Sequence, residues 1–113
     1  MKKRHWWFES EYGKAFVNIE DDNLVIKNRG VVTFGLHKKR DVKIKISDIK
    51  EIIIQKPKLF QSGYLYFVLT DEIPETDPAK IVLLNNSVNI KWKDELVYAY
   101  EIKAAIEEKN QGA

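Results

Sequence analysis

The residue types that usually carry catalysis or metal binding are few in this chain and lie far apart. The sequence has no cysteine and two histidines, His5 and His37, whose separation does not match a zinc site. Carboxylates cluster in the segment 71–77, but the order of a calcium loop is missing and prolines interrupt them. Neither a nucleophile elbow nor a glycine-rich phosphate loop occurs. We therefore expect no enzyme activity, no cofactor and no bound metal.

The stretch "SGYLYFVLT" (62–70) resembles the strand on which RNA-recognition domains stack bases. That signature starts with a basic residue and has a small residue between two aromatics, whereas Ser62 and Leu65 occupy these positions. Its fold also alternates strands with helices, and no helical pattern precedes residue 92. We interpret the stretch as a central strand that opens at Gly63, and nucleic acid is not an expected partner. Alternation divides its side chains between two faces, Leu65, Phe67 and Leu69 on one and Tyr64 and Tyr66 on the other.

The densest positive charge lies in "HKKRDVKIK", residues 37–45. Its candidate anion-binding residues are His37, Lys38, Lys39, Arg40, Lys43 and Lys45. The first four occupy a predicted hairpin loop, and the last two point to one side of the strand that follows. Such a cluster attracts anionic lipid, with roughly 1 kcal/mol from each Lys or Arg near the leaflet. Asp41 lies inside the cluster and opposes this attraction.

The first twelve residues, "MKKRHWWFESEY", are predicted to form a basic and aromatic arm ahead of a domain that spans residues 13–110. Trp6, Trp7 and Phe8 are its candidate contact residues for a membrane or a partner. They can also pack against the domain. We favour packing, because aromatic rings bury the largest apolar area available to a small domain.

Length and composition are those of one globular domain. The chain has 113 residues, of which 44% are hydrophobic and 32% are charged, and its formal net charge is +2. No apolar run approaches the roughly 18 residues that span a bilayer, and the start lacks the apolar centre of a signal peptide. Since cysteine is absent as well, we expect a cytoplasmic protein.

Alternating apolar and polar residues predict a mainly antiparallel β domain. The pattern is clearest in "DVKIKIS", where Val42, Ile44 and Ile46 point inward. Three consecutive isoleucines at 52–54 indicate a strand that is buried on both faces, or a bulge. The predicted strands are 14–20, 23–28, 31–35, 41–47, one around 52–54, 63–70, and a hairpin of 79–85 with 87–92.

Only the C-terminal end has helical periodicity. In "DELVYAYEIKAAIEEKN" (94–110) the apolar stripe consists of Tyr98, Ala99, Ile102, Ala105 and Ile106. We expect Asp94 to cap this helix, and Ile102 and Ile106 to be buried against the strands. Seven or eight short strands closed by one helix describe a small antiparallel β-sandwich or partly open barrel that an α-helix caps.

The order of these elements resembles the bacterial pleckstrin-homology-like (PH-like) domains, in particular uncharacterised proteins that often carry a short C-terminal helical appendage. The resemblance rests on "DNLVIKNRG", "VKIKISDIKEI", "SGYLYFVL" and the final helix, and covers about residues 13–108. It implies a PH-like fold. It does not imply phosphoinositide binding, and none of its motifs is catalytic. Because "NQGA" follows soon after the helix, we expect the appended segment to be missing from this sequence.

These observations favour a non-catalytic binding or scaffolding module for a protein partner, with self-association into a homo-oligomer as one form of it. The alternative is a peripheral membrane module that binds anionic lipid through the 37–45 hairpin. The two hypotheses demand different surfaces. Lipid binding needs a basic surface clear of acidic neighbours, whereas protein binding needs an exposed apolar patch or an uncovered edge strand.

Overall fold

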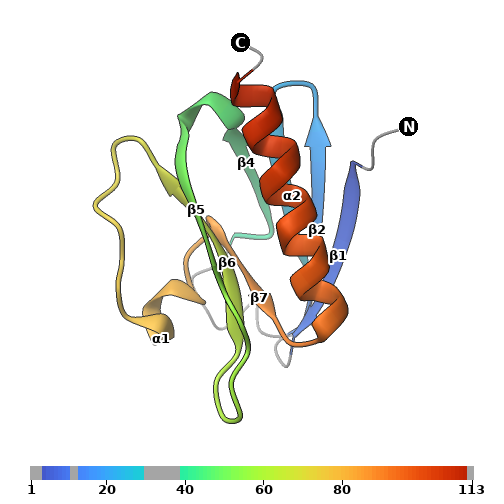
Figure 1. Cartoon of the computed structure of the whole chain (residues 1–113), viewed down its shortest axis with the longest axis vertical. Coiled ribbons are helices and arrows are strands. Elements are labelled where there is room, and N and C mark those ends of the chain that lie inside the picture. The colour runs from blue at the N-terminus through green and yellow to red at the C-terminus, as the bar shows by residue number, and fades with distance from the viewer. Residues whose placement is uncertain (1–3, 11–12, 30–38, 112–113) are drawn as a thin grey trace.

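Two antiparallel sheets and one long helix make up the described part of the computed structural model, which is residues 4–10, 13–29 and 39–111 (Figure 1). Sheet A contains, in spatial order, β1 (His5–Ser10), β2 (Gly13–Glu20), β3 (Asn23–Arg29) and β4 (Asp41–Lys45). Sheet B contains β5 (Ile49–Gln55), β6 (Gly63–Leu69) and β7 (Ser87–Ile90). The helices are the 3-10 turn η2 (Ile46–Asp48), α1 (Pro78–Ile81) and α2 (Lys93–Gln111). The mainly β fold with a C-terminal helix is thereby confirmed.

The alternation in the sequence decides which face of sheet A is buried. The side chains that point into the core are Ala15, Val17 and Ile19 from β2, and Leu24 and Ile26 from β3. The antiparallel register pairs Val17 with Ile26 and Ile19 with Leu24, so apolar side chains meet across the strands. These two strands are confirmed as predicted. The predicted strand 31–35 lies outside the described residues.

The chain passes from sheet A to sheet B at a corner made by β4, η2 and β5. β4 ends at Lys45, two residues earlier than predicted, because Ile46 begins the 3-10 turn while remaining buried. The register of β5 shifts between Ile49 and Glu51, and its residues 52–54 are half-buried on both faces. The three isoleucines thus belong to a strand that has apolar neighbours on each side, as expected, and an irregularity precedes them.

Strand β1 was not predicted. It pairs with β2 along its whole length, from His5 opposite Asn18 to Ser10 opposite Gly13. Three aromatic residues in a row conceal its alternation, yet Trp6 and Phe8 are buried and Trp7 lies exposed between them. The prediction that these aromatic residues pack against the domain is therefore confirmed for Trp6 and Phe8, but not for Trp7.

Strand β6 is buried on both faces. Leu65 and Phe67 belong to the main core between the sheets, and Tyr64 and Tyr66 belong to a second cluster on the other face. The predicted division of this strand into a face with Leu65 and Phe67 and a tyrosine face is confirmed. Gly63, at its start, faces the other arm of the hairpin, where a Cβ atom would lie 2.3 Å from the carbonyl oxygen of Gln55.

The predicted strand 79–85 is wrong. Residues 78–81 form helix α1, and turns follow. Asp77 caps this helix by accepting a hydrogen bond from the N–H of Ala79, and Pro78 occupies a first-turn position that needs no N–H donor. The apolar residues of "AKIVLLN" cover sheet B from a helix and turns and do not form a strand. Ile81, Val82 and Leu84 pack on the tyrosine face of β6.

Helix α2 lies across the open side of the two sheets and contacts β5, η2 and β1. Ala99, Ile102 and Ile106 are fully buried in the main core, as the apolar stripe predicted. None of the helices in the described part of the chain has the length and apolarity needed to cross a membrane.

The start of α2 is capped by Glu95 and not by the predicted Asp94. The buried Glu95 carboxylate accepts hydrogen bonds from the N–H groups of Lys91 at 2.7 Å and Trp92 at 3.2 Å. Its other oxygen accepts from the N–H of Glu9 in β1, at 2.5 Å. One carboxylate therefore satisfies donors at the helix start and joins the helix to the edge of sheet A.

Replacing Ile102 with Ala tests how much the docking of α2 contributes to stability. We expect the free energy of unfolding to fall by about 2–5 kcal/mol, because a fully buried side chain leaves a cavity. Equilibrium urea unfolding measures the loss. Val97→Ala, at an exposed position of the same helix, is the control and should change stability by no more than about 0.5 kcal/mol. Equal effects of both substitutions would show that the helix is not docked through Ile102.

Candidate functional site

An aromatic surface lies where the outer face of β1 and β2 meets helix α2. Trp7 is 58% exposed, although a side chain of this size is usually buried in a small domain. Phe16, its cross-strand neighbour, and Tyr98 of α2 are partly exposed. Trp6 turns inward, and its indole N–H donates to Glu101 Oε1 at 3.1 Å.

A cavity of about 260 Å³ opens in this surface. Its lining residues are His5, Trp6, Trp7, Phe16, Asn18 and Tyr98. His5 Nδ1 donates to Asn18 Oδ1 at 2.8 Å, so the polar part of the wall is internally bonded. The volume is below the roughly 300–1,000 Å³ of sites that enclose a small-molecule ligand. It suits one apolar side chain of a partner better than a cofactor. We call this cavity with its lining residues the aromatic pocket.

Cross-strand pairing places lysines next to the aromatic pocket, on the outer face of sheet A. Trp7 pairs with Phe16, and Phe16 pairs with Lys27, so the three side chains form one row. In the neighbouring row Val25 pairs with Lys43. Within the described part of the chain neither lysine forms a salt bridge, but the row of Lys27 ends at Asp41, its cross-strand neighbour in β4, which is bonded to Arg29. The outer face of sheet A therefore changes from aromatic at β1 and β2 to charged at β3 and β4.

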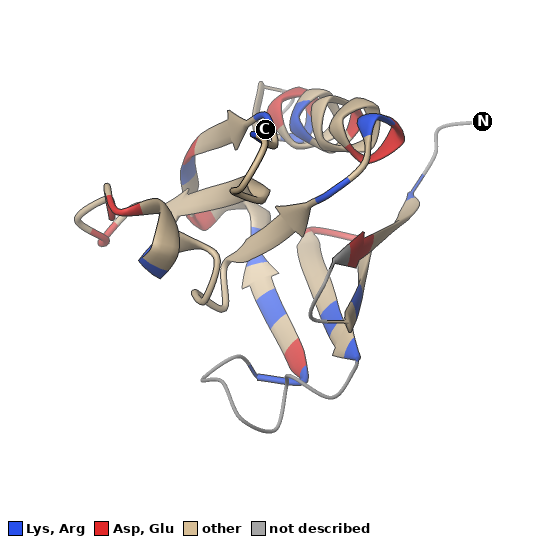
Figure 2. Cartoon of the chain, turned by 90° about the horizontal axis from the view of Figure 1, so that it is seen from below, with Lys and Arg blue, Asp and Glu red and all other residues tan. Residues whose placement is uncertain are grey.

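The basic stretch 37–45 is described only from Lys39 onward, since His37 and Lys38 lie outside the described residues. Lys39 and Arg40 are exposed, and Lys43 and Lys45 lie exposed on the strand that follows, on the predicted side. Figure 2 shows the blue bands of Lys and Arg on the neighbouring strands β3 and β4. The pairing of these strands thus extends the positive surface beyond the stretch that the sequence singled out.

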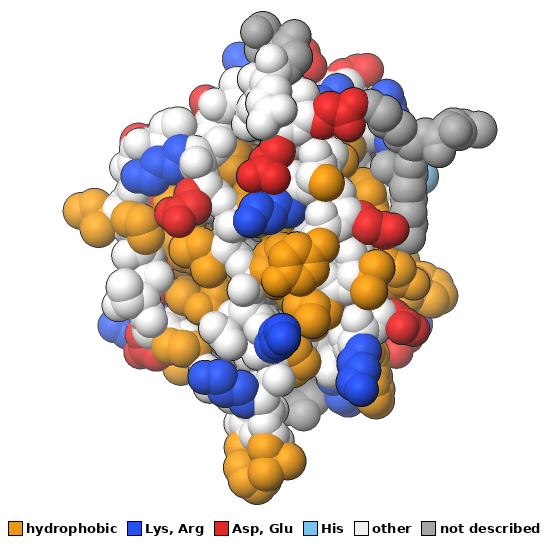
Figure 3. Space-filling view, viewed as in Figure 1, with side chains coloured by type: hydrophobic (Ala, Val, Ile, Leu, Met, Phe, Trp, Pro, Cys, Tyr) orange, Lys and Arg blue, Asp and Glu red, His pale blue; other side chains and the backbone are white. Residues whose placement is uncertain are grey.

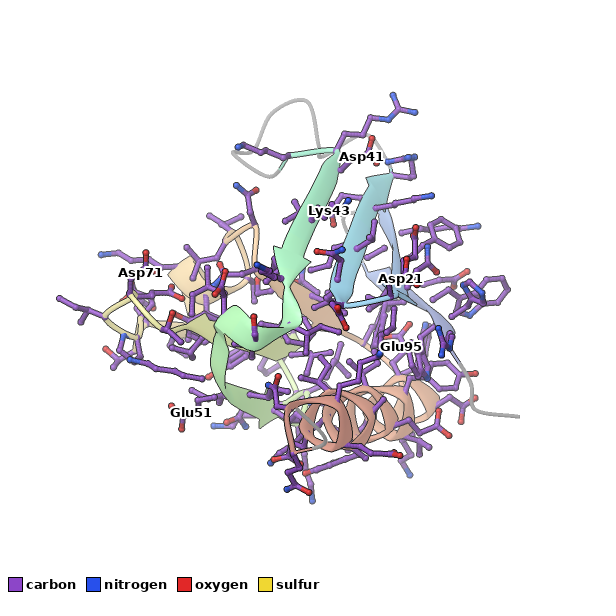
Figure 4. The ribbon with its side chains drawn as sticks, turned by 90° about the horizontal axis from the view of Figure 1, so that it is seen from above. Asp21, Asp41, Lys43, Glu51, Asp71 and Glu95 are labelled. Carbon is purple, nitrogen blue, oxygen red and sulfur yellow. The ribbon has the colours of Figure 1, made fainter. Side chains whose placement is uncertain are left out.

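An acidic residue is bonded inside this positive surface. Asp41 Oδ1 accepts from Arg29 Nη2 at 3.0 Å, and Arg29 Nη1 also donates to the carbonyl oxygen of Arg40 at 3.0 Å. Figure 4 shows Asp41 and Lys43 along β4, away from Glu95 at helix α2. Sequence reasoning missed Arg29, because its place beside Asp41 depends on how β3 and β4 are aligned. The ion pair neutralises part of the charge that a lipid headgroup would meet.

The tyrosines that resemble an RNA-binding strand are structural. Tyr64 and Tyr66 are buried, so neither ring face is open to a base. The Tyr66 hydroxyl donates to Glu72 Oε2 at 2.7 Å and accepts from the N–H of Glu75 at 3.1 Å. Glu72 in turn accepts from Asn86 Nδ2 at 2.9 Å. This network fixes the loop after β6 against sheet B. Burial, together with the hydrogen bond to Glu72, raises the pKa of Tyr66 to about 12.

Comparison with known proteins gives no relative, since no family model, curated protein or solved structure matches the chain. Among residues 4–10, 13–29 and 39–111, no three His, Asp or Glu side chains lie close enough together to hold a metal ion. The chemistry of the described surfaces is therefore what points to a function.

The raised pKa of Tyr66 predicts a loss of stability at high pH. The unfolded chain releases this proton near pH 10 and the folded chain near pH 12, so stability falls as pH rises through that interval. Tyr66→Phe removes the titration as well as the hydrogen bonds. Its stability deficit against the unmodified chain should be smaller at pH 11 than at pH 8, measured by urea unfolding. A deficit that stays constant would contradict the shift.

Burial of both tyrosines also predicts that single-stranded RNA binds no better than it does to any mildly basic protein. The expected Kd is weaker than about 10⁻⁶ M at physiological salt. Fluorescence anisotropy of a labelled oligonucleotide measures it. Tighter binding that disappears in Tyr64→Ala, with circular dichroism unchanged, would contradict the structural role of this strand.

Proposed function

We propose that this chain is a non-catalytic binding module that docks a protein partner on the outer face of sheet A. The observation that carries the proposal is the row formed by Trp7, Phe16 and Lys27, in which an exposed tryptophan borders a cavity and a lysine lies two strands away. Tryptophan is strongly enriched among the residues that dominate binding energy at protein interfaces. Folding does not require such a residue on a solvent-facing strand position.

We infer further that the domain is PH-like. A four-stranded and a three-stranded antiparallel sheet, joined at a corner and covered by a C-terminal helix, support that assignment. A fold hosts many functions, so it does not by itself name a ligand. What the fold contributes is a rigid outer face on sheet A, since the opposite face of this sheet forms the core.

The surface suits a partner segment of a definite chemistry. An aliphatic or aromatic side chain fills the aromatic pocket, against Trp7 and Tyr98. Acidic side chains that follow it along the partner meet Lys27 and Lys43, which form no salt bridge among the described residues; Asp41, opposite Lys27, is bonded to Arg29. An apolar anchor gives affinity by burial, and the charges give orientation and a faster encounter.

Anionic lipid binding through residues 37–45 stays the alternative, and the geometry supports it less well. Asp41 lies within the stretch and is bonded to Arg29, so the positive surface is not clear of acidic neighbours. Lys39 and Arg40 are exposed, but no exposed apolar side chain accompanies them among the described residues of the stretch. Charge alone gives a weak and salt-sensitive attachment.

Peptide selection by display, followed by titration, tests the proposed docking. We expect selected peptides to combine one large apolar residue with nearby acidic residues. Trp7→Ala should weaken their binding about 30-fold, the equivalent of about 2 kcal/mol, because the substitution removes the wall of the pocket. Isothermal titration calorimetry measures the Kd.

Trp92→Ala is the matched control, since Trp92 is also exposed but does not line the aromatic pocket. Selected peptides that bind Trp7→Ala as tightly as the unmodified chain would refute the docking site. Light scattering at rising protein concentration tests self-association. A dimer that dissociates in Trp7→Ala would identify the partner as a second copy of this chain.

A further inference from the structure

The hairpin that joins β5 and β6 carries two of the three most exposed large apolar side chains in the described part of the chain. Leu59 is 87% exposed and Phe60 is 95% exposed. The hairpin extends beyond the body of the domain in Figure 1. In Figure 3 an orange cap forms the lower extreme of the molecule, with blue side chains of Lys or Arg around its base. We call residues 56–62 the hairpin tip.

The hairpin tip is built to hold its shape. Lys58 and Gln61 form a bridge in which the N–H of Lys58 donates to the Gln61 carbonyl at 2.8 Å and the reverse bond measures 3.2 Å. Leu59 and Phe60 are thus the two residues at the end of a closed turn. Below them, Gly63 allows the two arms to approach more closely than a Cβ atom would permit. The apolar pair is presented on a fixed support, at little entropic cost to binding.

Neither folding nor turn geometry accounts for these two side chains. Neither residue has the positive φ for which hairpin turns favour Asn, Asp and Gly, so the backbone of this turn accepts most residue types and does not call for large apolar ones. Leu59 and Phe60 also contribute nothing to either hydrophobic cluster. A large apolar pair outside the core lowers solubility. Its exposure therefore points to an apolar binding partner.

The charges around the hairpin tip identify the kind of partner. Lys56 and Lys58 are exposed behind the apolar pair, and no Asp or Glu occurs between Glu51 and Asp71. Lys91 and the exposed Trp92 follow Ile90, which pairs with Gly63, so they lie at the base of the same hairpin. The Lys91 ammonium lies 5.0 Å from the centre of the Trp92 ring.

The order of these groups along the hairpin matches the layers of a bilayer surface. At about 3.3 Å per strand residue, Leu59 lies about 10 Å beyond Lys56. Apolar groups that rest in a membrane interface enter it by about 5–10 Å. With Leu59 and Phe60 at that depth, Lys56 lies at the level of the phosphates, and Lys58, one residue from Leu59, reaches them by extending its long side chain. Trp92 lies close to the headgroup region that tryptophan prefers.

We propose that the hairpin tip inserts into an anionic membrane surface, and that this second surface acts independently of partner docking on sheet A. A convex pair of side chains surrounded by cations fits a deformable anionic layer. A protein partner would have to supply an apolar cavity with an acidic rim, and such a partner is one of the outcomes that the experiment distinguishes.

Cosedimentation of the full chain with vesicles tests the proposal, using phosphatidylcholine with 0, 20 and 40 mol% phosphatidylserine at low and physiological salt. Binding should rise with anionic content and weaken with salt. Leu59→Ser with Phe60→Ser should reduce the partition coefficient at least tenfold. Lys56→Glu with Lys58→Glu should reduce it about 30-fold or more, since each lysine contributes about five-fold near an anionic leaflet.

The chain provides matched controls for both pairs. Ile73 is 92% exposed, but it lies in the acidic loop between Asp71 and Glu75, so Ile73→Ser should bind vesicles like the unmodified chain. Trp7→Ala should also leave vesicle binding unchanged, which separates this test from that of the proposed function. Lys39→Glu with Arg40→Glu tests the other basic segment and should have a smaller effect than the lysine pair of the tip.

Insertion can be observed directly, because the chain has no cysteine. Phe60→Cys and Ile73→Cys each create one labelling site for an environment-sensitive fluorophore. Emission from position 60 should shift to the blue on anionic vesicles, and emission from position 73 should not. No vesicle binding at low salt, as expected if an acidic protein pocket is the true partner, would overturn the proposal. Binding lost only in the Lys39 and Arg40 variant, or equal on neutral vesicles, would overturn it as well.

Discussion

The docking of helix α2 across the two sheets is the interaction on which the other features depend. Two small sheets that meet at a corner leave one side of their common core open to water. Ala99, Ile102 and Ile106 close that side, and their burial supplies the apolar contacts that neither sheet obtains alone. The Glu95 carboxylate then joins the helix start to the end of β7 and to Glu9 in β1. The end of β7 and the start of α2, which are neighbours in the sequence, are thus joined to the distant strand β1 by one buried acceptor group, which fixes the edge strand that carries Trp7.

Because β1 is held in place, the alternation that buries its core residues also determines which of its side chains lie on the outer surface. Once Trp6 and Phe8 are buried, the pleat of the strand turns Trp7 outward, and the register sets it against Phe16. The same constraint extends to the lysines, since Lys27 and Lys43 follow from the pairing of β3 with its neighbours. The proposed docking face is therefore a consequence of alternation in the four strands of sheet A, and it cannot be rearranged without moving the core.

Periodicity predicted the strands and the helix where one face is apolar and the other polar, as in 14–20 and 41–45, because burial alone determines that pattern. It failed at β1, where three adjacent aromatics hide the alternation, and at 79–85, where "AKIVLLN" covers the second face of sheet B. The Asp-Pro pair at 77–78 was a usable helix-start signal for the second case. Asp94 is the predicted cap, whereas Glu95 accepts the hydrogen bonds, because the N–H donor of Glu9 in β1 is not visible in the sequence around the helix start. Of the candidate site residues, Trp7 could be named from its type, but its row with Phe16 depends on register, which no single sequence specifies.

The hairpin tip is a second surface whose exposure the sequence alone does not predict. "PKLFQS" reads as a loop, and a loop with two apolar residues is ordinary in sequence, since such residues often fold back onto the domain. What makes Leu59 and Phe60 unusual is the length of paired strand beneath them and the close approach at Gly63, which carry the turn beyond the other described elements of the chain. The tip belongs to sheet B and the aromatic pocket to the outer face of sheet A with α2, and they share no residue. Because α2 holds the sheets in a fixed relation, a membrane at the tip and a protein on sheet A would not compete for the same side chains. If both proposals hold, the rigid core sets the orientation of a docked partner relative to the bilayer.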